Sequence, residues 1–150
     1  MNSKAEIAKN LFCTGANCAQ AVFGAFAEEC GFTQEEAFRI ASGFGGGMAR
    51  QREVCGAVSG MILVLNCQYG SNNIADKAAK DAHYARVQAI CERFRQEAGS
   101  IICRDLLGLA EDQKDKPQSE ERTAAYYKKR PCAELVALAA GLAEEAVSGK

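Results

Sequence analysis

Apolar residues recur at intervals of three and four positions along most of this chain, which is the spacing of helices that bury one face. No stretch shows a convincing alternation of apolar and polar residues, and only two prolines interrupt the chain. This pattern predicts an all-α, single-domain helical bundle of about six to seven helices. The expected helices cover residues 4–12, 17–30, 33–41, 55–69, 74–97 and 101–107, followed by a last helix from residue 131.

Residues that favour helix ends mark several of these boundaries. Asn17 and Ser100 are suited to cap helix N-termini, because their side chains can accept hydrogen bonds from unpaired backbone N–H groups. Thr33 and Glu36 have the Thr-x-x-Glu spacing of a capping box. Gly31 follows the second expected helix as a stop signal.

Two stretches lack a helical pattern, and one helix is apolar over nearly its whole length. Residues 42–53 include four glycines within five positions, and residues 110–130 are mostly polar. We therefore expect a loop in the first stretch and an exposed loop in the second. A helix that is apolar on all sides is usually buried, so the helix over 55–69 is predicted to be central.

Length and charge limit the classes of protein that fit. A chain of 150 residues, of which 48% are hydrophobic, can bury about two-thirds of the surface that it exposes when unfolded. This supports one domain over residues 1–150. The formal net charge of -1 favours neither nucleic acid nor an anionic membrane as a partner.

The N-terminal residues show no signal-peptide pattern, and the longest apolar run is too short to cross a membrane. We therefore expect a cytoplasmic protein without membrane insertion. An apolar helix face left open on a domain this small would favour a homodimer.

Four of the eight cysteines fall at the starts of expected helices: Cys18, Cys55, Cys103 and Cys132. In a reducing compartment, cysteines serve as thiols, metal ligands or redox partners more often than as structural disulfides. Backbone N–H groups and the helix dipole favour anions in a first turn, so we expect lowered pKa values for these four thiols. Neighbouring cationic side chains would lower the pKa of Cys55 and Cys132 further.

The other four cysteines are expected to be core or incidental thiols. Cys30 and Cys67 lie near expected helix C-termini, Cys91 lies on an apolar stripe, and Cys13 lies at a helix end. The simplest alternative for all eight cysteines is that they are small buried hydrophobic residues. His83, the only histidine, is expected to be a half-buried helix residue, and no oriented partner supports a Cys-His hydrolase.

Four pieces of the sequence together resemble one known family. They are "NCAQAVFGAFAEECG", "ASGFGGGMARQREVCGAVSGMILVLNCQYG", "FRQEAGSIICRDLLG" and "PCAELVALAAGLAEE". In this combination the chain is similar to the redox-active C_GCAxxG_C_C proteins, which are named for a CGAxxG motif and four characteristic cysteines. The resemblance places those cysteines at Cys18, Cys55, Cys103 and Cys132 and implies a redox role.

The motif "CGAVSG" and the preceding glycines point to a crowded environment around Cys55. Gly56 and Gly60 would keep this helix slim enough for another backbone, or a bulky cofactor, to approach the sulfur. Gly46 and Gly47 would let the preceding loop fold back and point N–H groups at the same place. The alternative is that both stretches only permit tight packing and a turn. A dinucleotide site is disfavoured, because "GFGGGM" lacks the third glycine of G-x-G-x-x-G and follows no strand.

Two chemistries fit four converging cysteines, and the sequence leaves both open. One is thiol/disulfide or electron-transfer chemistry with a redox partner protein that the sequence does not identify. The other is the binding of an iron-sulfur cluster or a thiophilic metal by the same four cysteines, without turnover. The sequence has none of the close C-x-x-C pairs typical of zinc or ferredoxin sites. A purely structural role for the cysteines is the third alternative, and whether the protein is an enzyme stays open.

Overall fold

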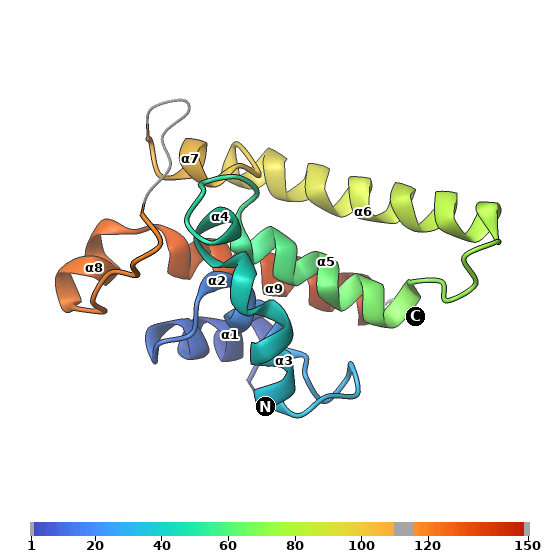
Figure 1. The fold of residues 1–150 in the computed structure, drawn as a ribbon, viewed down its shortest axis with the longest axis horizontal. Coiled ribbons are helices and arrows are strands. Elements are labelled where there is room, and N and C mark those ends of the chain that lie inside the picture. The colour runs from blue at the N-terminus through green and yellow to red at the C-terminus, as the bar shows by residue number, and fades with distance from the viewer. Residues whose placement is uncertain (1, 110–115, 149–150) are drawn as a thin grey trace.

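The computed structural model describes residues 2–109 and 116–148, and these residues form an all-α domain without a named strand (Figure 1). The expected all-α class is therefore confirmed. The helices are α1 (Lys4–Cys13), α2 (Cys18–Ala25), α3 (Gln34–Ala41), α4 (Gly45–Met48), α5 (Gly56–Tyr69), α6 (Lys77–Ala98), α7 (Cys103–Leu106), α8 (Ala124–Lys129) and α9 (Cys132–Ser148), with a 3-10 turn η1 (Ser42–Phe44) between α3 and α4.

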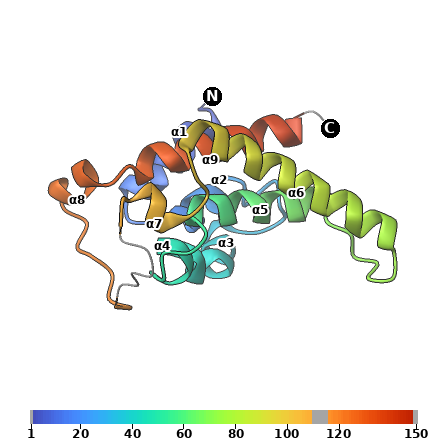
Figure 2. The ribbon, with the colours of Figure 1, turned by 90° about the horizontal axis from the view of Figure 1, so that it is seen from above.

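The long helices pack around a shared core. Helix α1 packs against α9 and α2, while α5 packs against α2, α9 and α6. In both views the start of α6 and the short helix α8 lie at opposite ends of the molecule (Figures 1 and 2). The largest fully buried side chains are Phe12, Phe23, Phe26, Phe94, Met61 and Leu65. Within the described residues, no helix combines the length and apolar character needed to cross a bilayer.

Local capping signals explain several helix starts. Asn17 caps α2, and its side chain accepts a hydrogen bond from the N–H of Gln20. Thr33 caps α3 in the same way, and the Glu36 side chain completes the capping box. Both predicted caps are confirmed. The predicted cap at Ser100 is wrong, because Ile102 is the N-cap of α7.

Other boundaries differ from the prediction. Helix α2 ends at Ala25, and residues 26–31 form turns instead of continuing the helix. The stretch 42–53 contains η1 and α4, so it is not simply a loop. The predicted exposed loop over residues 110–130 is confirmed only in part. Residues 116–123 are irregular, but residues 124–129 form α8. Residues 110–115 lie outside the described part of the chain. The sequence of α8 is too short to give a clear helical period.

Helix α5 illustrates how small residues position the core. Its buried residues run from Gly56 to Leu65, whereas Asn66 and Cys67 near its end are exposed. A Cβ atom at Gly60 would lie 2.9 Å from the Ala19 carbonyl oxygen and 2.9 Å from the Val22 Cβ, both on α2. The missing side chain thus lets the backbones of α2 and α5 approach closely.

We predict that Gly60→Ala lowers the free energy of unfolding by about 1–3 kcal/mol, because overpacking against α2 outweighs the better helix propensity of alanine. Gly141→Ala in α9 is the matched control, since a Cβ there meets nothing within 4 Å. We expect that control to be stabilised by about 0.5–1 kcal/mol. Urea unfolding of both variants measures the difference, and equal stabilisation by the two changes would contradict the close approach.

Candidate functional site

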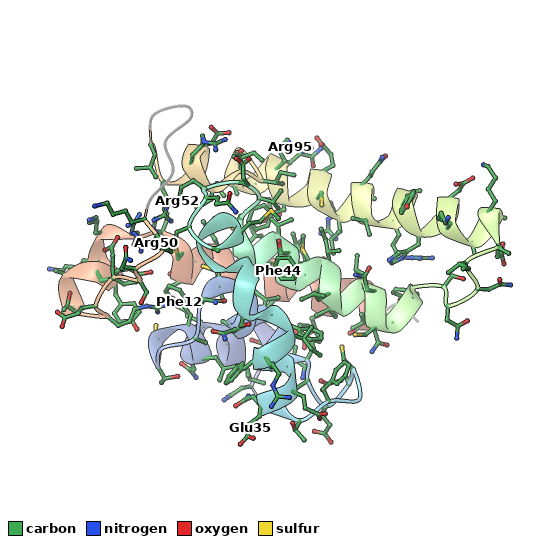
Figure 3. All side chains as sticks on the ribbon, viewed as in Figure 1. Phe12, Glu35, Phe44, Arg50, Arg52 and Arg95 are labelled. Carbon is green, nitrogen blue, oxygen red and sulfur yellow. The ribbon has the colours of Figure 1, made fainter. Side chains whose placement is uncertain are left out.

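The four cysteines at the predicted helix starts line a single cavity of about 310 Å³. Cys18 begins α2, Cys55 caps α5, Cys103 begins α7 and Cys132 begins α9. The cavity lies toward the end of the molecule that carries α8, where Figure 3 labels Phe12, Arg50 and Arg52. Residues that are far apart in the sequence are therefore brought together at the ends of four helices.

A short pairing of two extended segments brings the start of α5, with Cys55, to the start of α7, with Cys103. The Cys55 N–H donates to the Ile101 carbonyl oxygen at 2.8 Å, and the Cys103 N–H donates to the Glu53 carbonyl oxygen at 2.6 Å. Between them, Val54 and Ile102 form an antiparallel bridge. The sequence does not predict this pairing, because so few residues form it that they show no strand pattern.

Cys18 is positioned by the cap that precedes it. The Asn17 side chain also donates from Nδ2 to the Ser42 carbonyl oxygen at 3.1 Å, which ties the start of α2 to the start of η1. A Cβ at Gly56 would lie 3.2 Å from the Cys18 Cβ and 3.2 Å from the Ala19 nitrogen. The glycine that follows Cys55 therefore provides the space in which the start of α2, with Cys18, packs.

The glycine run ends in a left-handed turn that brings Arg52 into the site. Gly46 and Gly47 have φ values of 69° and 71°, and positive φ continues through Met48 and Ala49. Left-handed backbone costs non-glycine residues about 1–2 kcal/mol each, so packing must hold this turn in place. Arg52, only 4% exposed, donates from Nη1 to the Cys103 Sγ at 3.6 Å.

The four candidate glycines have different positions. Gly46, Gly47 and Gly56 line the cavity. Gly60 is not among the lining residues and instead packs against α2. The space left by the missing side chain at Gly60 is therefore filled by α2.

A hydrogen bond between two thiols distinguishes Cys18 from Cys132. Hydrogen bonding with the Cys18 thiol is the main cause of the lowered pKa of Cys132. Burial opposes the lowering, while the positive charges of Arg130 and Arg52 add to it. The same hydrogen bond, with burial, raises the pKa of Cys18 well above its ordinary value. Cys132 is therefore the readiest thiolate of the pair.

Burial reverses the predicted pKa change at the other helix starts. It raises the pKa of Cys55 to about 12, although the N–H groups of Ala57 and Val58 favour the thiolate. Burial also raises the pKa of Cys103, against the opposing effect of Arg52. The expectation of lowered pKa values is thus wrong for Cys18, Cys55 and Cys103. Desolvation of a buried thiolate exceeds the stabilisation by a helix start.

The segment that precedes α9, for which the sequence predicted only an exposed loop, forms another wall of the cavity. Arg122 donates to the carbonyl oxygens of Phe12 and Ala16, each at 3.1 Å, and its guanidinium stacks 4.7 Å from the Phe12 ring centre. Arg130 pairs with Glu120. The cationic side chains that line the cavity are Arg50, Arg52, Arg122 and Arg130.

The remaining candidate residues lie outside the cavity lining. Cys13 and Cys67 are exposed, while Cys30 and Cys91 are only partly buried, so none of these four is a fully buried core thiol. His83 is half-buried, and its Nε2 lies 2.7 Å from the Asn66 Oδ1. Burial and the charge of Arg86 lower the pKa of His83.

The second chemistry expected of the four cysteines is the binding of a metal or an iron-sulfur cluster. Over residues 2–109 and 116–148, no group of three or more Cys, His, Asp or Glu side chains is placed to hold one metal ion. The four thiols therefore line one cavity without forming such a group.

Comparison with known proteins places this arrangement in a family. The family model described as "Putative redox-active protein (C_GCAxxG_C_C)" matches residues 16–146, nearly the whole chain. The chain belongs to this C_GCAxxG_C_C family. The resemblance noted from the sequence is therefore confirmed. No curated protein and no solved structure matches the chain.

Proposed function

We propose that this C_GCAxxG_C_C protein is a dithiol redox protein in which Cys132 and Cys18 form a reversible disulfide. The observation that carries the proposal is that Cys18, at the start of α2, and Cys132, at the start of α9, line the same cavity. One thiol of the pair has a lowered pKa and the other a raised pKa. This difference assigns the attacking role to Cys132 and the resolving role to Cys18.

The reaction proceeds in two exchange steps. The Cys132 thiolate attacks one sulfur of a disulfide, a new S–S bond forms, and the leaving thiolate takes up a proton. Cys18 then loses its proton and attacks the Cys132 sulfur, which breaks the mixed disulfide and releases the second thiol. Two electrons pass from the cysteine pair to the disulfide, which belongs to a redox partner protein or a small molecule.

The surroundings of the pair support this assignment of roles. Arg130 and Arg52 stabilise the negative charge on Cys132 before attack and favour its departure in the reverse reaction. Cys55 and Cys103 have raised pKa values, so both are protonated at neutral pH and are weaker first nucleophiles. The proposal includes a cytoplasmic location, where eight cysteines without a disulfide are typical of the reducing environment.

A second candidate is a carrier of an iron-sulfur cluster or a thiophilic metal. The supporting observation is that Cys18, Cys55, Cys103 and Cys132 all line one cavity. Thiolates are the preferred ligands of such groups, and the guanidinium groups in the cavity wall would offset their negative charge. In this alternative the four cysteines are ligands and form no disulfide with one another.

We predict that protein purified without oxygen and treated with one equivalent of oxidised glutathione forms a Cys18–Cys132 disulfide. Peptide mapping after alkylation of the remaining thiols identifies the bond, and Cys91→Ser serves as a control that should oxidise like the wild type. Iron and acid-labile sulfide are measured on the same preparation. Equal amounts of both, lost in Cys55→Ser, would support the cluster instead, and a metal-free protein that forms no Cys18–Cys132 bond would contradict both functions.

A further inference from the structure

The charged side chains around the four-cysteine cavity are unevenly divided. Arg50, Arg52, Arg122 and Arg130 line it, whereas Glu120 is the one carboxylate among the described lining residues. The whole chain has 18 basic and 19 acidic residues, so an even distribution of charge would not give this excess. Positive charge is therefore concentrated at the cavity that holds the cysteines.

The described partners of Arg122 are all neutral groups. Arg122 donates to the carbonyl oxygens of Phe12 and Ala16 and, at 3.4 Å, to the hydroxyl of Tyr127. Its guanidinium also stacks 4.9 Å from the Tyr126 ring centre. Carbonyl oxygens, hydroxyls and aromatic rings hold a guanidinium in place without a full negative charge to balance it. An anion in the cavity would supply that charge.

Arg50 and Arg130 add positive charge to the same lining. Arg50 is half-buried and donates from Nε to the Lys116 carbonyl oxygen at 3.0 Å. The side chain of Arg130 is only 11% exposed and pairs with Glu120. Solvent and salt screen charges in such partly buried positions less than charges on an open surface. An anion inside the cavity is therefore attracted more strongly than one on the outer surface.

The size and the apolar part of the lining limit what can enter. A volume of about 310 Å³ lies at the lower end of the range of about 300–1,000 Å³ that is typical of small-molecule sites. Apolar surface comes from Phe12, Leu106, Leu107 and Leu135. A small molecule with short carbon chains, negatively charged ends and a group that reacts with thiols fits this combination.

From the arginines and cysteines that share this one cavity, we infer that it takes small disulfides whose carbon chains end in carboxylates. The inference rests on the proposed function, since it names the substrate class of the Cys18–Cys132 pair. The carboxylates bind the arginines, and this binding brings the S–S bond to the Cys132 sulfur. In the exchange, the dithiol gives two electrons and two protons to the substrate, whose S–S bond breaks to leave two thiols, and the Cys18–Cys132 bond forms.

A matched series of probes tests the charge preference. Dithiodipropionate carries two carboxylates, bis(2-hydroxyethyl) disulfide is neutral and cystamine is cationic, while the S–S bond and its neighbouring methylene groups are the same. Peptide mapping follows formation of the Cys18–Cys132 disulfide. Each rate is divided by that of the same probe with 2-mercaptoethanol, which corrects for the leaving thiol. We expect dithiodipropionate to react about tenfold faster than the neutral probe, cystamine to react slowest, and added salt to reduce the difference.

Two substitutions should change this preference in opposite directions. Arg50→Gln removes a positive charge and should lower the preference for dithiodipropionate about threefold or more, whereas Glu120→Gln removes a carboxylate and should raise it. Arg93→Gln is the matched control, because Arg93 is 52% exposed on α6 and does not line the cavity. It should keep the wild-type preference. Circular dichroism checks that each variant is folded.

A probe without sulfur separates this inference from the proposed function. Suberate is dithiodipropionate with both sulfurs replaced by methylene groups, so it binds without exchange. Calorimetric titration should show that suberate binds the wild-type protein, binds Arg50→Gln more weakly, and competes with dithiodipropionate. Bound suberate in a protein that forms no Cys18–Cys132 bond with any probe would contradict the proposed function alone. Equal corrected rates with the three disulfides, or no binding of suberate, would overturn the inference alone.

Discussion

Cys18→Ser should trap a mixed disulfide on Cys132, whereas Cys132→Ser should prevent that disulfide from forming. The first variant keeps the attacking thiolate and its arginines but loses the thiol that resolves the intermediate. The second loses the cysteine of the four whose pKa is lowered. We expect reaction of the cavity cysteines with a small disulfide at pH 7 to slow by about tenfold or more in Cys132→Ser.

The pH dependence of alkylation provides the direct measurement. Because the reactive species is the thiolate and the pKa of Cys132 lies below the ordinary value of 9.0, labelling of Cys132 should reach half its maximal rate below pH 9.0. Cys18→Ala removes the hydrogen-bond donor to the Cys132 sulfur, so the profile of Cys132 should move to higher pH in that variant. Cys91→Ser is the control and should leave the profile unchanged. A profile for Cys132 that is the same in Cys18→Ala and wild type would contradict the effect of the Cys18 thiol on Cys132.

Much of the local structure could be predicted from the sequence because its signals are local. Asn17 and Thr33 cap α2 and α3 by accepting hydrogen bonds from backbone N–H groups three residues later. Both partners of each bond therefore lie close together in the sequence, where a short motif reveals them. The helix-start positions of Cys18 and Cys132 follow from the same kind of signal. The four cysteines that the sequence places at helix starts are also the four that line one cavity.

What could not be predicted depends on contacts between distant segments. The pairing of residues 52–55 with residues 101–104 brings the starts of α5 and α7 together, yet neither segment has a strand pattern. Arg122 joins the wall of the cavity through the carbonyl oxygens of Phe12 and Ala16, which no local motif specifies. The pKa of a thiol depends on burial in the folded chain, so helix position alone gave the wrong direction for Cys55.

Gly47 lies in a tightly packed left-handed turn that lines the cavity. Its φ of 71° belongs to the left-handed region, and an added Cβ would lie 2.6 Å from the Cys103 Cβ. The same Cβ would lie 2.8 Å from the Glu53 nitrogen and 2.9 Å from the Arg52 Cα. Backbone atoms cannot move aside as the end of a flexible side chain does, so alanine must displace the turn.

We predict that Gly47→Ala lowers the free energy of unfolding by about 3 kcal/mol, from left-handed strain together with overpacking. Gly43→Ala is the matched control in the same stretch, because a Cβ there meets nothing within 4 Å and its φ is not positive. Urea unfolding should show a large loss for the first variant and little change for the second. Equal stability of the two variants would contradict the left-handed conformation and tight packing at Gly47.

The same substitution should also change the chemistry of the folded fraction. Displacing the turn moves Arg52 away from Cys103 and reduces its positive charge near Cys132, so the pKa of Cys132 should rise. Alkylation of Cys132 in folded Gly47→Ala protein should then require higher pH than in Gly43→Ala. A purely destabilised protein with an intact site would instead keep the wild-type pH profile, so this measurement distinguishes a role in forming the site from a role in stability alone.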